Sequence, residues 1–160
     1  MTLFLFPSNF FVCFVSYTAI HYLLVAVTGL PQPTKEHAVI MAYFARDCLR
    51  KMDVLCKQLE TSLGPDTSEL KLRIGMHSGA VTGGVLRGKR SRFQLFGDTV
   101  NTAARVEASG EGGRIHLSED TAVLLEKAGK AHWITKRAEP LNLKGTFELL
   151  RPKKECIVCI

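Results

Sequence analysis

The sequence predicts an α+β fold in which helices cover a sheet of short strands. From residue 35 to residue 60, apolar side chains recur every three or four positions, which is the spacing of an amphipathic helix. From residue 70 to residue 76, apolar residues alternate with others, as in a strand with one buried face. A short apolar run at 92–96 precedes a Gly-Asp turn and a second helical segment. Strand and helix patterns therefore share one chain, which indicates a mixed domain.

The composition allows one globular domain and selects no partner by itself. A chain of 160 residues with 46% hydrophobic and 22% charged residues can build a core of its own. The net charge of +6 suits a polyanionic ligand such as a nucleotide, and it suits nucleic acid or an anionic membrane surface equally well. The five cysteines are unevenly spaced, which does not indicate a disulfide framework. The lone Cys156-x-x-Cys159 pair indicates free thiols in a basic tail, residues 151–160.

The first residues form an apolar segment, 1–24, whose status is open. No charged side chain occurs in residues 1–34, and the apolar run is long enough to cross a bilayer. Three interpretations stand: a membrane segment or signal anchor, a buried strand after unrelated sequence, or a wrongly chosen start or retained intron. Pro7 and several polar residues interrupt the run, and no basic residues precede it as in a secretory signal. Membrane association is thus one of the alternatives.

The long helix at 35–60 is expected between a Gly-Leu-Pro-Gln-Pro turn at 29–33 and a Gly-Pro-Asp loop at 64–66. After it, His77-Ser78-Gly79 is expected to end the strand at 70–76. A second strand at 80–86 would then complete a hairpin. Neighbouring residues on a strand point to opposite faces, so His77 and Ser78 are not expected to form a catalytic pair.

A phosphate-loop pattern at 83–90 is not expected to bind phosphate. GGVLRGKR has Arg90 where such a loop needs a Ser or Thr for magnesium, and a strand pattern follows it instead of a helix. We interpret residues 87–92 as a basic hairpin loop. Its basic side chains suit contact with RNA, DNA or lipid head groups, but no aromatic residues for base stacking accompany it, so a sequence-reading nucleic-acid module is not predicted.

The stretch RFQLFGDTVNTAAR, residues 92–105, is the most informative part of the chain. It predicts a strand, a tight turn and a helix that begins near Thr99, with Asp98 or Thr99 as its cap. In that helix, Asn101 and Arg105 are four residues apart and point from one face. An amide and a permanent cation near a helix start suit a phosphate-bearing ligand. Such a pair on a helix is, however, more often simply solvated.

The sequence after residue 105 predicts elements that only pack against the rest of the domain. Residues 110–113 form a Gly-rich loop, 114–117 a short strand, and Ser118 the cap of a helix that Gly129 ends. Residues 132–134 and 141–150 are expected to be closing strands.

Two motifs together resemble the C-terminal half of a class III nucleotide cyclase catalytic domain. They are RIGMHSG at 73–79 and the run from 92 to 121. The resemblance extends to VAVTGLP at 25–31 and LNLKGTFEL at 141–149, so it covers residues 25–150. FGD at 96–98, in place of WGN, resembles the guanylyl type. The resemblance implies a ferredoxin-like antiparallel sheet flanked by helices, truncated at its N-terminal side, and a phosphorus-oxygen lyase that forms cGMP or cAMP from GTP or ATP.

The resemblance also assigns site residues. In the family, each site lies between two domains of a dimer. Asn101 matches the family residue that orients the ribose, and Arg105 matches the one that stabilises charge on the phosphates. The further nucleotide-binding positions are Phe93, Gln94, Asp98 and Lys144. Gln94 stands where the family reads the base edge; because an amide both donates and accepts, it leaves GTP or ATP open.

The same resemblance implies Mg²⁺ or Mn²⁺ but leaves this chain without metal ligands. Tyr22 stands where the family has a metal-binding Asp, and His21 stands where it has the preceding Gly. No acidic residue occurs before Glu36, and neither replacement supplies the carboxylates that magnesium prefers. The expectation is a domain inactive alone that pairs, as a homodimer or as a heterodimer with an intact cyclase domain. The catalytic domain would be intracellular and membrane-associated, or else cytoplasmic.

Two alternatives remain open from the sequence. One is a non-catalytic dimerisation or regulatory module with the cyclase fold. The other is a basic protein that binds a membrane or RNA surface through the cluster at 87–92.

Overall fold

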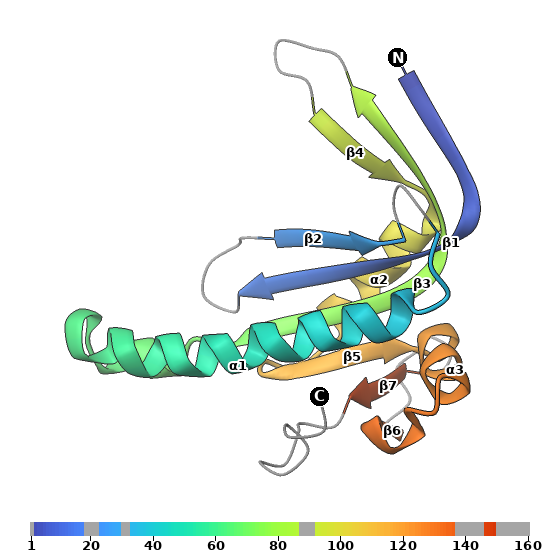
Figure 1. Cartoon of the computed structure of the whole chain (residues 1–160). Helices are drawn as coiled ribbons and strands as arrows, with labels where there is room; N and C mark the ends of the chain where they lie inside the picture. The colour runs from blue at the N-terminus through green and yellow to red at the C-terminus, as the bar shows by residue number, and fades with distance from the viewer. Residues whose placement is uncertain (1, 18–22, 30–32, 87–91, 137–145, 150–160) are drawn as a thin grey trace.

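A computed structural model describes residues 2–17, 23–29, 33–86, 92–136 and 146–149, and within them a sheet is flanked by helices (Figure 1). The strands are β1 (Thr2–Tyr17), β2 (Leu23–Thr28), β3 (Leu72–Leu86), β4 (Arg92–Phe96), β5 (Arg114–Ser118), β6 (Ile134–Lys136) and β7 (Thr146–Leu149). The helices are α1 (His37–Leu63), α2 (Asp98–Ala108) and α3 (Glu119–Lys127), with short 3-10 turns η1 (Pro65–Glu69) and η2 (Ala131–Trp133). The predicted α+β class is confirmed.

Strand β3 is the centre of the sheet. The strand order is β2-β1-β3-β5-β7-β6, and β4 pairs with β3 outside this path. The β3–β5 pair is parallel, whereas the other described pairs are antiparallel. The chain runs from β3 through the antiparallel strand β4 and helix α2 to β5. This connection brings the chain back to the end of the sheet where β3 begins, so β5 runs parallel to β3.

Helix α1 and helix α2 lie on opposite faces of the sheet (Figure 1). The apolar stripe of α1 packs on alternate residues of β3 and on β5 and α3. This core contains Ala38, Met41, Ala42, Ala45, Leu49, Leu72, Ile74, Met76, Ile115, Leu117 and Leu125. Burial of each large apolar side chain contributes about 1.5–3 kcal/mol. The predicted long helix is confirmed, although it begins at His37 and ends at Leu63.

The hairpin expected around residue 79 is wrong. Strand β3 continues through His77, Ser78 and Gly79, where it pairs antiparallel with β1, and only its last part, 82–86, pairs with β4. The glycines serve another purpose, because a Cβ on Gly75 would lie 2.2 Å from the backbone nitrogen of Glu107 in α2. A Cβ on Gly79 would lie 2.5 Å from Thr99 Oγ1. These two glycines therefore let α2 approach the strand and do not form a turn.

The helix starts were predicted with mixed success. Ser118 caps α3 as expected, since its side-chain oxygen accepts from the Thr121 N–H at 3.4 Å. The cap of α2 is instead Gly97, whose φ of 137° favours glycine, and neither Asp98 nor Thr99 caps that helix. The predicted strand at 132–134 lies two residues later, at β6, because His132 and Trp133 belong to η2.

In the part of the chain that the structure describes, no helix has both the length and the apolarity to span a bilayer. Residues 2–17 form β1 of the same sheet. The division into segments 1–24, 25–150 and 151–160 remains a prediction.

Candidate functional site

The candidate site is the outer face of α2. Strand β4 leads into this helix through the single residue Gly97, so the helix start is fixed relative to the strand. At that start, the Thr99 hydroxyl donates a 2.6 Å hydrogen bond to the carbonyl oxygen of Ala80 in β3. Thr99 is buried there against Gly79. The first turn of α2 is therefore attached to β3 by a polar contact as well as by close packing.

The other end of α2 is attached by an ion pair. Arg73 Nε of β3 donates to Glu107 Oε1 over 2.5 Å, and Glu107 is only 6% exposed. Because Gly75 lies beneath the Glu107 backbone, the ion pair and the close approach occur at one place. A hydrogen-bonded pair of charges with one member buried holds its geometry better than a pair on the open surface.

These contacts decide which face of α2 meets solvent. The buried side consists of Thr99, Ala103, Val106 and Glu107. On the opposite side, Asp98, Asn101 and Arg105 are exposed. Helical spacing of four residues places Asn101 and Arg105 next to each other on this outer face. The predicted common face is confirmed, while the role of each residue with a ligand remains a prediction.

Strand β4 adds exposed side chains next to α2. Phe93 is 59% exposed and Phe96 is 39% exposed, and Gln94 is exposed between them. Leu95 packs instead with Val81 and α2 residues in a small second core. The structure thus leaves Phe93, Gln94 and Asp98 accessible. Among the described residues, no hydrogen bond or ion pair joins these three side chains to Asn101 or Arg105, and Lys144 lies outside the described part of the chain.

A buried hydrogen-bond network under the helix starts was missed by sequence reasoning. His77 Nδ1 lies 2.7 Å from Ser118 Oγ, and the two residues are 41 positions apart. Burial lowers the pKa of His77 below its ordinary value of 6.5, while the negative charges of Asp120 and Asp98 act to raise it. The parallel pairing of β3 with β5 brings these two residues together, so no local sequence pattern predicts the contact.

The described residues do not offer a metal centre. Among them, no three His, Cys, Asp or Glu side chains gather closely enough to hold an ion. Tyr22 and His21, which stand at the family's Gly-Asp position, lie outside the described part of the chain. No described residue is therefore assigned to a metal.

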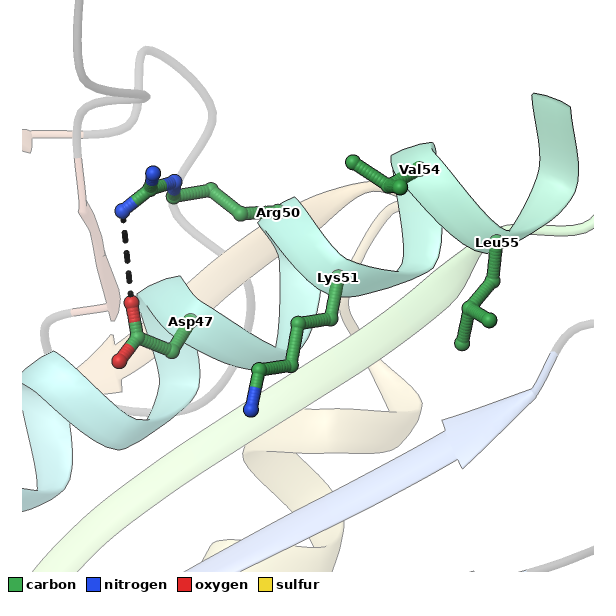
Figure 2. A pocket seen from close by; sticks show the side chains of 5 residues that line it. All are labelled: Asp47, Arg50, Lys51, Val54 and Leu55. Atoms are coloured by element: carbon green, nitrogen blue, oxygen red, sulfur yellow. Dashed lines mark ion pairs between the residues drawn. The ribbon is translucent and has the colours of Figure 1, made fainter. Parts of the chain in front are cut away.

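A groove on α1 is separate from the candidate site (Figure 2). It encloses about 400 Å³ and is lined by Asp47, Arg50, Lys51, Val54 and Leu55. Arg50 and Asp47 point toward each other and form an ion pair of 3.6 Å (Figure 2). All five of these described residues belong to one helix, and no polar group of another described element lines the groove with them, unlike in ligand sites where polar groups converge. This groove is not assigned a ligand.

Comparisons with known proteins agree with the geometry. The family model described as "Adenylate and Guanylate cyclase catalytic domain" matches residues 21–158. The chain is 40% identical over 124 residues to the receptor-type guanylate cyclase gcy-28 of Caenorhabditis elegans, covering 77% of this chain and 9% of that protein. It is 38% identical to the soluble guanylate cyclase subunit beta-2 of Rattus norvegicus, covering 74% of this chain and 16% of the relative. The chain thus spans a small part of these relatives.

Solved structures show the same fold. The guanylate cyclase domain of RhGC from Catenaria anguillulae, in complex with GTP, superposes with a TM-score of 0.72 at 23% identity, over 96% of this chain and 100% of that one. The adenylyl cyclase CyaB from P. aeruginosa gives a TM-score of 0.76 at 17% identity, over 91% and 95% of the two chains. At such low identity the superpositions establish the fold alone. The family match and the relatives establish that this chain belongs to the adenylate and guanylate cyclase catalytic domain family.

Proposed function

We propose that this chain supplies the sugar- and phosphate-binding side of a nucleotide cyclase site and takes part in forming a cyclic nucleotide from a nucleoside triphosphate. The observation that carries the proposal is the outer face of α2. There, Asn101 and Arg105 are exposed side by side on a helix whose other face is fixed to β3. By their resemblance to the family motif, these two positions are the ones proposed to meet ribose and phosphate.

The chemistry of the two side chains fits this role. The Arg105 guanidinium is a permanent cation with several N–H donors, so it can stabilise the negative charge that develops on the phosphates. The Asn101 amide can both donate and accept, which suits a ribose hydroxyl or ring oxygen. Since α2 is attached at both ends, these groups need little rearrangement when a nucleotide binds.

The metal ligands would come from a partner domain. The family requires Mg²⁺ or Mn²⁺, and the donor set of the described residues does not fit such an ion. We therefore propose that the chain is inactive alone and completes a site with an intact cyclase domain. We propose a heterodimer with an intact cyclase domain as the productive assembly, with a homodimer as the alternative. Receptor-type and soluble relatives both exist, and membrane association stays open.

The proposed substrate is GTP, with ATP as the alternative. The curated relatives are guanylate cyclases, and FGD at 96–98 resembles the guanylyl type. The guanylate cyclase domain of RhGC was solved with GTP, and a rhodopsin-guanylyl cyclase with converted specificity was solved with ATPαS. Exposed Gln94 can pair with either purine edge, so parallel assays with the two nucleotides decide between them.

A complementation assay tests the proposal. The full chain is mixed with an intact cyclase whose own phosphate-stabilising arginine has been replaced by alanine, so that Arg105 alone can restore product. We expect cyclic nucleotide to form only in the mixture. Arg105→Ala should lower the rate about a hundredfold, the usual cost of losing a transition-state donor. The matched control is Arg50→Ala, which removes an exposed arginine of α1 and should leave the rate unchanged. Equal rates with and without Arg105 would refute the proposal.

A second candidate is a non-catalytic dimerisation or regulatory module. Exposed Phe93 and Phe96 on β4 favour it, because large exposed aromatic residues are typical of protein contacts. In this case the chain would bind the intact cyclase and change its activity, and Arg105→Ala would be silent. A thermal shift of the isolated chain that depends on added nucleotide would argue against a purely structural role.

A further inference from the structure

Five consecutive residues of β3 hold the starts of two helices. The carbonyl oxygen of Ala80 accepts from the Thr99 hydroxyl of α2, and Gly79 packs against the same side chain. One step back, Ser78 Oγ lies 3.4 Å from Thr121 Oγ1 of α3, and the Met76 carbonyl lies 3.5 Å from that oxygen. His77 lies between them and meets the α3 cap, Ser118. A change in this short segment therefore reaches both helices.

His77 is the only one of these five residues that titrates. It is 9% exposed, and its Nδ1 lies 2.7 Å from Ser118 Oγ. Ser118 Oγ in turn accepts from the Thr121 N–H and lies 3.1 Å from Thr121 Oγ1. The neutral imidazole thus completes a buried network of hydroxyl groups that fixes the first turn of α3. Such buried polar networks are costly to disturb, because a group that loses its hydrogen-bond partner cannot bond to water instead.

The charged groups that face His77 come from the first turns of α2 and α3. Asp120 Oδ2 of α3 lies 3.9 Å from His77 Nδ1, but its side chain is 74% exposed. Asp98 of α2 acts at longer range. On strand β5, the titratable residue nearest in register is His116, which lies opposite Gly75 and whose Nε2 accepts from the Glu111 N–H. The pKa of His77 is lowered, so burial outweighs both carboxylates and the neutral form is the one that fits.

We infer that His77 is a positioning residue for the Asn101–Arg105 face of α2. In its neutral state it holds the α3 cap and the shared β3 segment in one arrangement, and its protonation loosens the first turns of both helices. The inference rests on the proposed function for its catalytic consequence, because His77 itself lies beneath α2 and does not meet the nucleotide. A cyclase site built on this helix would lose order in acid.

The direction of the pH effect follows from linkage. The unfolded chain protonates His77 near the ordinary value of 6.5, whereas the folded chain does so only at lower pH because its pKa is lowered. At a pH between the unfolded and the folded pKa of His77, the unfolded or opened state binds more protons than the folded state. The stability that neutral His77 provides is therefore complete above pH 6.5. It is lost as the pH falls toward the folded-state pKa.

Amide exchange of the full chain between pH 5 and 8 tests the inference without nucleotide or partner. After correction for intrinsic exchange, we expect the amides of Val100, Thr102, Ala103 and Thr121 to lose protection as the pH falls below 6.5. His77→Asn places an amide atom where Nδ1 lies and has no proton to titrate, so protection should stay level with pH. His77→Ala should lower protection at every pH. His132→Asn, an exposed histidine of η2, should retain the wild-type pH dependence.

The outcomes separate this inference from the proposed function. Wild-type pH dependence in His77→Asn, or wild-type protection in His77→Ala, overturns the inference. In the complementation assay, His77→Ala should reduce the rate and His77→Asn should restore it, with little change in KM for the nucleotide. If Arg105→Ala is silent in that assay, the proposed function fails, while the exchange measurement still decides the role of His77.

Discussion

Helices α1 and α2 are attached to the two faces of β3 by different means. Helix α1 presents a stripe of apolar side chains to Ile74 and Met76. Helix α2 approaches through Gly75 and Gly79, and polar side chains fix both of its ends. One strand supports both arrangements because its residues alternate between the faces.

The difference shows why the site lies on α2. Apolar burial stabilises a helix strongly, but it has no direction and tolerates small shifts. Hydrogen bonds and glycine contacts contribute less free energy, yet they specify the distance and the rotation of the helix. Asn101 and Arg105 need that rotation, because a turn of the helix about its axis would bury them. Stability and precision are therefore provided on separate faces of the same strand.

The largest expected effect on stability is at α1. Met41 is 1% exposed in the core, so Met41→Ala should reduce the free energy of unfolding by about 2–5 kcal/mol. Urea denaturation measures it, and Phe44→Ala, at a 38% exposed position of the same helix, should cost far less. At urea concentrations below the denaturation midpoint, the Met41→Ala chain should still restore product in the complementation assay through Arg105. Equal costs at Met41 and Phe44 would contradict this view of α1.

A smaller stability effect with a larger functional effect is expected at the α2 contact. Gly75→Ala places a Cβ against the Glu107 backbone, so α2 must shift. Overpacking of this kind costs about 1–3 kcal/mol. The rate in the complementation assay should fall by more than the loss of folded chain accounts for, because Asn101 and Arg105 move with the helix. Gly64→Ala is the control: strain at its φ of 100° costs about 1–3 kcal/mol, but α2 is untouched and activity per folded molecule should persist.

The contrast between the helices also explains what the sequence could predict. The long helix was predictable because many residues of 35–60 agree on one period, so single errors do not matter. The common face of Asn101 and Arg105 was predictable because four-residue spacing is a local property of any helix. Both predictions depend only on residues close together in the chain.

The errors concern contacts between distant residues. Gly79 resembles a turn residue in its own neighbourhood, but its Cβ position is taken by Thr99, twenty residues later. Thr99 resembles a helix cap, but its hydroxyl binds the carbonyl of Ala80 instead. His77 was compared with its neighbour Ser78, whereas its partner is Ser118 on another strand. What positions the site is thus set by tertiary packing, which local patterns do not encode.

The smallest expected stability effect tests the most specific of these contacts. Thr99→Val keeps the shape of the side chain and removes the hydroxyl that donates to Ala80. Because the carbonyl oxygen loses its partner in a part-buried place, the cost should be about 1 kcal/mol. Complementation should fall with Thr99→Val and be retained in Thr99→Ser, which keeps the donor. Full activity in the valine variant would show that close packing at Gly79 is enough to orient α2, and that the polar contact adds nothing.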